Sequence, residues 1–334
     1  MKFCPECGTL LVSQKFCQEC GCNISKYTGG NSESESNNVS LNSFDFSSLQ
    51  IEAESQLNEQ SGFEVVDGVL VKYHGNDENV IVPKSISKIG KMAFYENESI
   101  VSVKISQGVK EIAPSAFNSC RNLEIVTLTE GLEMIGENAF ASAGKLRKIN
   151  IPNSVKIIQN NAFTSCESLR EITIPGSVRS VANSAFSSCT GLENLIIKEG
   201  VTTIERDAFL FCESLTKIVL PESVRKIEMM AFCGCKNVTF LQIPNSLNKI
   251  EHATFGQLGI TTLQIPNSIT EICDNAFGAC FKLKEIKIPQ SVKRLGSDVF
   301  YNCPNLTKVY IPKHLDTNLR SLGLSNSSCK IIYY

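Results

Sequence analysis

The sequence predicts a mainly β fold, a right-handed solenoid of about ten short units. The first observation behind this prediction is a phenylalanine that returns at a fixed spacing, at Phe94, Phe117, Phe140, Phe163, Phe186, Phe209, Phe232, Phe255, Phe277 and Phe300. Every step is 23 residues except the step to Phe277, which is 22. The second observation is a pair of apolar residues two positions apart, ended by proline in most units. Such a period indicates units that bury their apolar faces only against their neighbours.

Each unit follows the pattern I-P-x-S-V-x-x-I-x-x-x-A-F-x-x-C-x-x-L-x-x-I-x, as in residues 151–173. We expect the main strand at L-x-x-I-x-I, because Ile172 and Ile174 alternate with the period of a β-strand. Pro175 then removes a hydrogen-bond donor where pairing should stop. V-x-x-I predicts a second, shorter extended segment. A-F-x-x-C-x-x-L predicts an outer turn, with one turn of helix as an option, and stacked coils predict a ladder of phenylalanine rings.

The turn after the main strand has two chemistries. Most units with proline carry serine two residues later, whereas three units without proline carry Gly108, Gly131 or Gly200 there. One unit is also shorter than the rest, because residues 255–260 lack both the usual cysteine and one spacer residue. The sequence therefore predicts a local kink or a shortened outer turn at that point, and no catalytic feature.

Cysteine recurs three residues after the phenylalanine in seven units, at Cys120, Cys166, Cys189, Cys212, Cys235, Cys280 and Cys303. Adjacent coils bring such cysteines near disulfide distance, but side chains in register point the same way, which is poor geometry for a bridge. We therefore expect a column of small buried thiols rather than a metal or redox ladder.

Two cysteine pairs stand apart from the repeats, at the start of the chain. Cys4 and Cys7, then Cys17 and Cys20, form two C-x-x-C turns, each followed by glycine. Two such turns complete a tetrahedral thiolate shell, which favours one structural Zn²⁺ with no open position for catalysis. The pattern C-P-x-C-G…C-x-x-C-G resembles the small zinc ribbons at the N-termini of many prokaryotic proteins. Cys22 lies outside this motif.

Composition divides the chain into three predicted parts. Residues 1–24 form the zinc ribbon, and residues 25–62, rich in Ser, Asn, Glu and Gln, form a disordered linker. Residues 63–334 form the solenoid, with an N-terminal cap at 63–82 and a C-terminal cap at 313–334. In the first cap Asp67-Gly68 indicates a hairpin turn.

Charge and hydropathy exclude several classes of protein. The net charge is −2 and the basic residues of the first segment are few, so nucleic-acid binding is disfavoured. No apolar run is long enough for a membrane span, and the first residues lack the apolar core of a secretory signal. The 15 cysteines then suit a reducing compartment, so a cytoplasmic location is predicted, with the cell surface as the alternative.

The repeat pattern resembles the BspA-type (Treponema pallidum-type) leucine-rich repeats over residues 63–334. It departs from the common leucine-rich repeat, because Ser177 or Gly200 stands where asparagine is usual. The resemblance implies a leucine-rich-repeat solenoid that acts as a binding module. Some family members are surface adhesins, but those carry export signals.

Catalytic patterns are missing from the sequence. The three histidines, His74, His252 and His314, fall in different units, and no nucleophile or phosphate-binding motif is found. We therefore expect a non-enzymatic protein. The candidate binding surface is the outward side of the main strands, unless one of its two rows faces inward. Its predicted partner-binding residues are Ile196, Val219, Phe240, Gln242, Gln264 and Tyr310.

Three functional hypotheses follow. The first is a protein-interaction scaffold whose strand face binds a protein partner, with a tethered structural zinc ribbon. The second is a BspA-type surface adhesin exported without a recognisable signal. The third is a nucleic-acid-associated factor that acts through the zinc ribbon.

Overall fold

The computed structural model describes residues 2–3, 10–11, 62–315, 317–324 and 328–334. The chain divides into two compact units, residues 1–49 and 50–334. In the first unit, β1 (Lys2–Phe3) pairs antiparallel with β2 (Leu10–Leu11). The four predicted zinc ligands and nearly all of the predicted linker lie outside the described residues, so both remain predictions.

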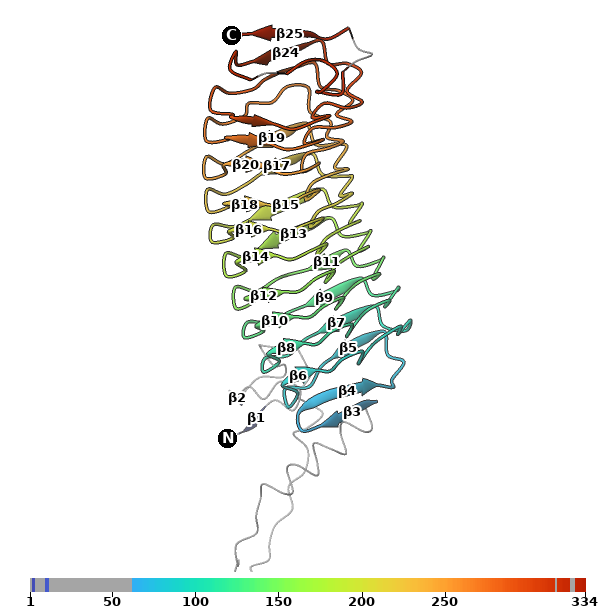
Figure 1. The fold of residues 1–334 in the computed structure, drawn as a ribbon. Helices are drawn as coiled ribbons and strands as arrows, with labels where there is room; N and C mark the ends of the chain where they lie inside the picture. The colour runs from blue at the N-terminus through green and yellow to red at the C-terminus, as the bar shows by residue number, and fades with distance from the viewer. Residues whose placement is uncertain (1, 4–9, 12–61, 316, 325–327) are drawn as a thin grey trace, which may run out of the picture. The chain divides into compact units, whose positions relative to one another are not determined.

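The second unit is a β-solenoid of about eleven turns, and its described residues contain no helix (Figure 1). Each coil adds short strands to two columns. The main column holds β5 (Asn79–Ile81), β7 (Ser102–Lys104), β9 (Ile125–Thr127), β11 (Lys148–Ile149), β13 (Glu171–Ile174), β15 (Asn194–Ile197), β17 (Lys217–Val219), β19 (Phe240–Gln242), β22 (Glu285–Lys287), β24 (Lys308–Ile311) and β25 (Lys330–Tyr333).

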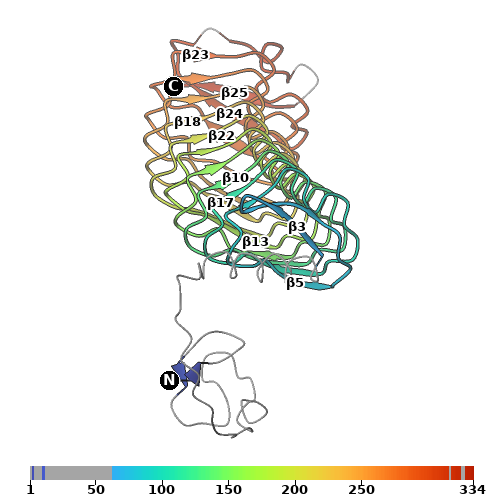
Figure 2. The same ribbon diagram turned by 90° about the horizontal axis from the view of Figure 1, so that it is seen from below.

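The second column runs beside the main one and begins with a hairpin. It holds β3 (Phe63–Val66), β4 (Val69–Tyr73), β6 (Lys88–Ile89), β8 (Glu111–Ile112), β10 (Met134–Ile135), β12 (Ile157–Ile158), β14 (Ser180–Val181), β16 (Thr203–Ile204), β18 (Lys226–Ile227), β20 (Lys249–Ile250), β21 (Glu271–Ile272) and β23 (Arg294–Leu295). All pairs in both columns are parallel except β3 with β4. Figure 2, turned by 90°, shows the coils stacked along one axis.

The predicted hairpin turn is present. Asp67 and Gly68 have φ angles of 49° and 72°, which closes the tight turn between β3 and β4. The rings of Phe63 and Tyr73 lie 5.0 Å apart, and Tyr73 lies 5.1 Å from Phe94. The cap therefore covers the end of the phenylalanine ladder with two further aromatic rings. At the other end of the solenoid, β25 adds a parallel strand beside β24.

The outer turn contains no helical turn, so that option was wrong. The residues two before and two after each repeated phenylalanine have positive φ, as with Ser115 (57°) and Ser119 (60°) around Phe117. Because left-handed residues alternate, every second N–H group points along the stacking direction to the next coil, while the N–H groups between them donate within the same coil. Phe117 N–H accordingly donates to the carbonyl of Ala139 in the next coil, at 2.7 Å.

These outer turns form a continuous column, which we call the turn column. The repeated phenylalanine donates a backbone hydrogen bond to the next coil at each step from Phe94 to Phe300. The rings stack in the same order, with centroids 4.6 to 6.2 Å apart, and the three widest pairs follow Phe232. The predicted ring ladder is confirmed.

The strand columns, by contrast, are interrupted. Within the described residues, the main column lacks strand pairing between β11 and β13, between β15 and β17, and after β19. The second column lacks it between β12 and β14 and between β18 and β20. The step from the coil of Phe163 to the coil of Phe186 therefore has neither ladder. The turn column is the element that holds every coil to the next.

The cysteine column consists of free, buried thiols. Each Sγ donates to the carbonyl of the phenylalanine in the preceding coil, for example Cys189 to Phe163 at 3.2 Å. Burial raises the pKa of the Cys120 and Cys189 thiols to about 12, so both are protonated at neutral pH. The cysteine thus serves as a small hydrogen-bond donor in the core.

A serine ladder occupies the position where common leucine-rich repeats have asparagine. Ser177 Oγ donates to the carbonyl of Val155 in the preceding coil at 2.6 Å, and Ser223 and Ser291 make the equivalent bond at 2.7 Å. In a glycine-bearing coil, Gly200 N–H instead donates to the hydroxyl of Ser223. The glycine turns and the serine turns therefore belong to one hydrogen-bonded column, in which a serine hydroxyl accepts from the glycine N–H of the preceding coil.

Candidate functional site

The outward side of the main column forms the strand face, which consists of two rows of side chains. One row runs through Asn150, Thr173, Ile196, Val219, Gln242, Gln264, Lys287 and Tyr310, and the other through Lys148, Glu171, Asn194, Lys217, Phe240, Thr262, Glu285 and Lys308. All of these residues are exposed except Tyr310, which is partly buried. Neither row faces inward, because the intervening residues, such as Ile172 and Ile218, fill the core.

Three of the predicted partner-binding residues form an apolar patch on this face. Ile196, Val219 and Phe240 are 51%, 47% and 53% exposed and lie on the successive strands β15, β17 and β19. Val219 of β17 pairs in register with Gln242 of β19. Phe240 lies on β19, two residues before Gln242. Exposed apolar side chains on neighbouring strands are typical of protein-contact surfaces.

Tyr310 lies apart from this apolar patch. It sits on β24, in register with Lys287 of β22 and Ile332 of β25. Tyr310 therefore has an in-register neighbour on each side, in β22 and in β25. The set of residues predicted from the sequence thus divides into one cluster near β15–β19 and a separate residue at the end of the solenoid.

A groove of about 660 Å³ opens in the strand face beside β19. Its walls come from β19 on one side and residues 262–265 on the other, so Gln242 and Gln264 lie on opposite walls. Within the described residues, this wall segment makes no backbone hydrogen bond to β19, and it pairs with the following coil through one bridge, Gln264 to Lys287. The groove lies where the repeat is one residue short.

The missing residue shortens the segment after the phenylalanine turn, where residues 258–260 lack the second turn of other units, and the strand that follows is not paired with β19. Phe255 N–H still donates to the next coil at 3.0 Å, so the turn column passes through the short unit unbroken. The sequence located this irregularity correctly but did not indicate that it would open the strand face. The broken serine ladder is a further sign of the irregularity, because Ser268 Oγ is buried in the groove wall without a hydrogen-bond partner.

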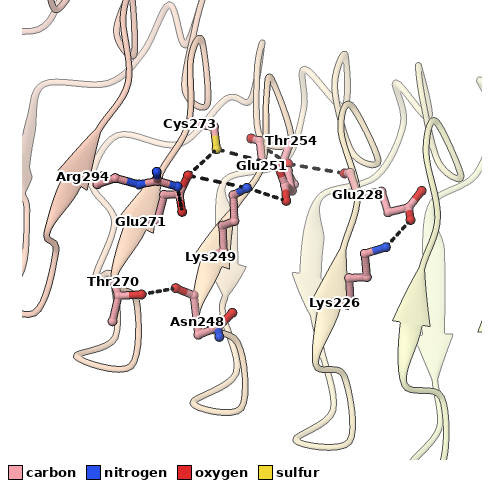
Figure 3. Close-up of polar contacts among 10 residues, drawn as sticks. All are labelled: Lys226, Glu228, Asn248, Lys249, Glu251, Thr254, Thr270, Glu271, Cys273 and Arg294. Atoms are coloured by element: carbon pink, nitrogen blue, oxygen red, sulfur yellow. Dashed lines mark hydrogen bonds and ion pairs between the residues drawn. The ribbon is translucent and has the colours of Figure 1, made fainter.

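The second column carries a chain of ion pairs near the same coils (Figure 3). Lys249 contacts Glu251 at 3.0 Å and Glu271 at 3.5 Å, and Arg294 also contacts Glu271. The hydrogen bond from Arg294 holds the pKa of Glu271 below its ordinary value. Exposed pairs of this kind contribute little stability, but they neutralise one another and leave a solvated polar face.

Cys273 lies within this chain of ion pairs, as Figure 3 shows. Its Sγ lies 3.7 Å from Glu251 and 3.6 Å from Glu271. Burial, followed by the two nearby carboxylates, outweighs Lys249 and raises the pKa of this thiol to about 11. Because the thiolate is the nucleophile, Cys273 is poorly suited to covalent chemistry at neutral pH.

Two of the three histidines make side-chain contacts within the solenoid. His74 Nε2 lies 2.9 Å from Glu64 in the N-terminal cap, and His314 Nε2 lies 2.7 Å from the carbonyl of Val292, at the position of the serine ladder. In the part of the chain that the structure describes, no three His, Cys, Asp or Glu side chains gather as a metal site.

Sequence reasoning missed several exposed apolar side chains. Ile81 is 65% exposed at the start of the same row as Val219, and its 23-residue register would have identified it. Phe281 and Tyr301 are exposed near the turn column, and they do not follow the repeat pattern. Among the described residues, no helix is long and apolar enough to cross a membrane.

Comparison with known proteins gives a consistent result. The model of the BspA type leucine rich repeat region matches residues 72–167, 134–257 and 202–327. A solved leucine rich cell surface protein from Faecalibacterium prausnitzii A2-165 is 26% identical, with a TM-score of 0.53, over 79% of this chain and 90% of that one. No curated protein matches the chain.

A leucine-rich repeat protein from Bacteroides ovatus ATCC 8483 is 21% identical, with a TM-score of 0.55, over 80% of this chain and 94% of that one. At this identity the likeness concerns the fold alone, which is again a repeat solenoid. Together with the 23-residue period, the two columns and the turn column, the family match shows that this chain belongs to the BspA-type leucine-rich repeat family.

Proposed function

We propose that this protein is a non-enzymatic scaffold for protein–protein interaction, and that its strand face binds the partner. The observation that carries the proposal is the apolar patch of Ile196, Val219 and Phe240 on three successive strands. The flanking positions are polar or charged, among them Asn194 and Lys217. An apolar centre with a polar rim is the usual anatomy of a protein interface.

The experiment that tests this proposal is affinity capture with the full chain. Ile196→Glu and Val219→Glu should each remove the captured partner, because a carboxylate would be desolvated at the centre of the interface. Thr173→Glu, in the same row but outside the apolar patch, serves as the matched control and should retain it. Equal capture by all three variants would rule out the apolar patch as the binding surface.

We further propose that Cys4, Cys7, Cys17 and Cys20 hold one structural Zn²⁺ in a ribbon that supplies a second contact. Two C-x-x-C turns with a following glycine support this proposal. Metal analysis of purified full chain should give about one zinc per chain, and Cys4→Ser should lower that value. Cys22→Ser is the matched control, and zinc-free protein with an ordered ribbon in NMR spectra would contradict the site.

An adhesin at the cell surface is the second candidate function. It is supported by the similar solved structure from F. prausnitzii, which is described as a cell surface protein. Cell fractionation combined with thiol counting separates the two candidates. Surface-exposed protein with oxidised cysteines would favour the adhesin, whereas protein inside the cell with reduced cysteines would favour the scaffold.

A further inference from the structure

The groove beside β19 combines four features at one place in the strand face. It has a volume of about 660 Å³, it falls at the single 22-residue unit, its two walls are not paired with each other, and a buried hydroxyl in it lacks a partner. A second groove of about 500 Å³ lies at the break between β12 and β14, but all of its described hydroxyl groups are partnered. The groove beside β19 is therefore the stronger candidate site.

The unpaired backbone indicates what kind of ligand the groove takes. A parallel strand pairs alternate residues with each of its two neighbours, and β19 has only one neighbour, β17. Its other edge therefore presents N–H and C=O groups to the groove. An extended peptide satisfies such groups by adding a strand, which is a recurring mode of peptide recognition.

The side chains of the groove restrict the ligand further. Phe240 stands half exposed at the rim and offers an apolar surface, whereas Gln242 and Gln264 supply amide groups from the two walls. Glu222 is the one charged residue in the lining, and its Oε1 accepts the backbone N–H of Asn245. A carboxylate at one end of the groove favours a basic residue in the ligand.

From this arrangement we infer that the groove binds an extended, neutral to basic peptide segment of the protein partner by strand addition to β19. The peptide backbone pairs with the free edge of β19. An apolar side chain packs on Phe240, and a Lys or Arg faces Glu222. This inference rests on the proposed scaffold function, because it names how that scaffold holds its partner.

The test uses the full chain and a phage-displayed library of random dodecapeptides. Selected sequences are synthesised with a fluorescent label, and binding is measured by fluorescence anisotropy. We expect alternating apolar residues with at least one Lys or Arg. Methylation of alternate backbone nitrogens should weaken binding by about tenfold or more, because it removes the donors needed for strand pairing.

The matched variant restores the period of the short unit. Insertion of one serine between Gly259 and Ile260 makes this unit 23 residues long, so its strand should pair with β19 and close the groove. Peptide binding should then be lost. Glu222→Gln and Phe240→Ser keep the coil length and should each weaken binding by about threefold to tenfold, which covers the case of an insertion that misfolds.

The outcomes distinguish this inference from the broader proposal. Peptides that bind the insertion variant or the methylated analogues as tightly as the original overturn the groove site, as does the absence of enriched sequences. Ile196→Glu lies outside the groove and should leave peptide affinity within about twofold. If this variant abolishes partner capture but groove-dependent peptides are absent, the groove inference alone fails. If groove-dependent peptides bind but capture is unaffected by Ile196→Glu, the apolar patch fails.

Discussion

Single serine hydroxyl groups add a hydrogen bond between neighbouring coils. Ser177 is the clearest case, because its hydroxyl bonds Val155 across the step that lacks both strand ladders. Ser268 occupies the same repeat position in the short unit and has no partner. The two serines are thus a natural pair for measuring the contribution of the ladder.

Ser177→Ala should lower the free energy of unfolding by about 1–2 kcal/mol, because a buried carbonyl loses its donor. Ser268→Ala should change it by about 0.5 kcal/mol or less, since no hydrogen bond is removed. Urea denaturation of the two variants and the parent protein measures both values. Equal losses at the two positions would show that the serine ladder does not stabilise the stack.

The buried thiols predict how stability depends on pH. Their folded-state pKa, about 12 for Cys120 and Cys189, lies above the value of 9.0 expected for an ordinary thiol. The unfolded chain therefore loses protons first, and stability is retained below about pH 9 and falls as the pH rises toward 12.

Cys189→Ala should make this alkaline decline shallower, although its stability at pH 8 is lower than that of the parent. Denaturation at pH 8, 9 and 10 measures the slope for both proteins. Because lysine and tyrosine titrate equally in the two proteins, the difference between the two slopes of stability against pH comes from titration of the Cys189 thiol. Identical slopes would contradict a raised pKa at Cys189.

At the scale of the element, the outer turn is what the sequence described least well. Main strands were predictable, because alternating isoleucines and a following proline define them locally. The turn depends on left-handed residues, and nine residue types occur at those positions: Ser, Asn, Asp, Met, Phe, Ala, Glu, Gln and Gly. No single residue type marks them, so the alternation becomes visible only when neighbouring coils provide carbonyl acceptors.

Ala279 offers a test of this backbone conformation. Its φ of 55° is unfavourable for a residue with a Cβ atom, so Ala279→Gly should raise the free energy of unfolding by about 0.5–1 kcal/mol. Ala276→Gly in the same turn, at a buried position without positive φ, should lower it by a similar amount. Thermal unfolding of both variants checks the prediction, and a loss at both positions would contradict it.

The candidate site was predictable in part for a related reason. Ile196, Val219 and Phe240 were identified because apolar residues stand at repeat positions that are polar in other coils. The groove was not identified, because the sequence places the one-residue deletion at residues 255–260 but does not show how it affects the pairing of the strand that follows. The structure shows both effects, a shortened segment at residues 258–260 and an unpaired strand beside β19, because the turn column still fixes the phenylalanine of each coil.

For the whole molecule, the step between the coils of Phe163 and Phe186 is the predicted weak point. It relies on the turn column, the stacked rings at 5.0 Å and the serine bond, without strand pairing on either side. The stability of a solenoid is the sum of the stability of each coil and of the interfaces between neighbouring coils. A weak interface should therefore allow the parts on its two sides to unfold in separate steps.

Hydrogen exchange measured by mass spectrometry should therefore show lower protection in residues 148–158 and 171–181 than in residues 102–112 and 125–135, where both ladders are present. A low concentration of urea should increase this difference in protection, because the solenoid should unfold first at that step. Uniform protection along the solenoid would show that the turn column alone sets the cooperativity.

The unbroken turn column also has a mechanical meaning. Hydrogen bonds run unbroken along the turn column, whereas both strand columns are interrupted. The solenoid should therefore bend more easily in the plane that opens the strand columns than in the plane at right angles to it. Each block of paired main-column strands can tilt about the turn column without straining the next block. A partner seated on β15–β19 would then change the curvature of the array locally, while the far ends of the solenoid keep their shape.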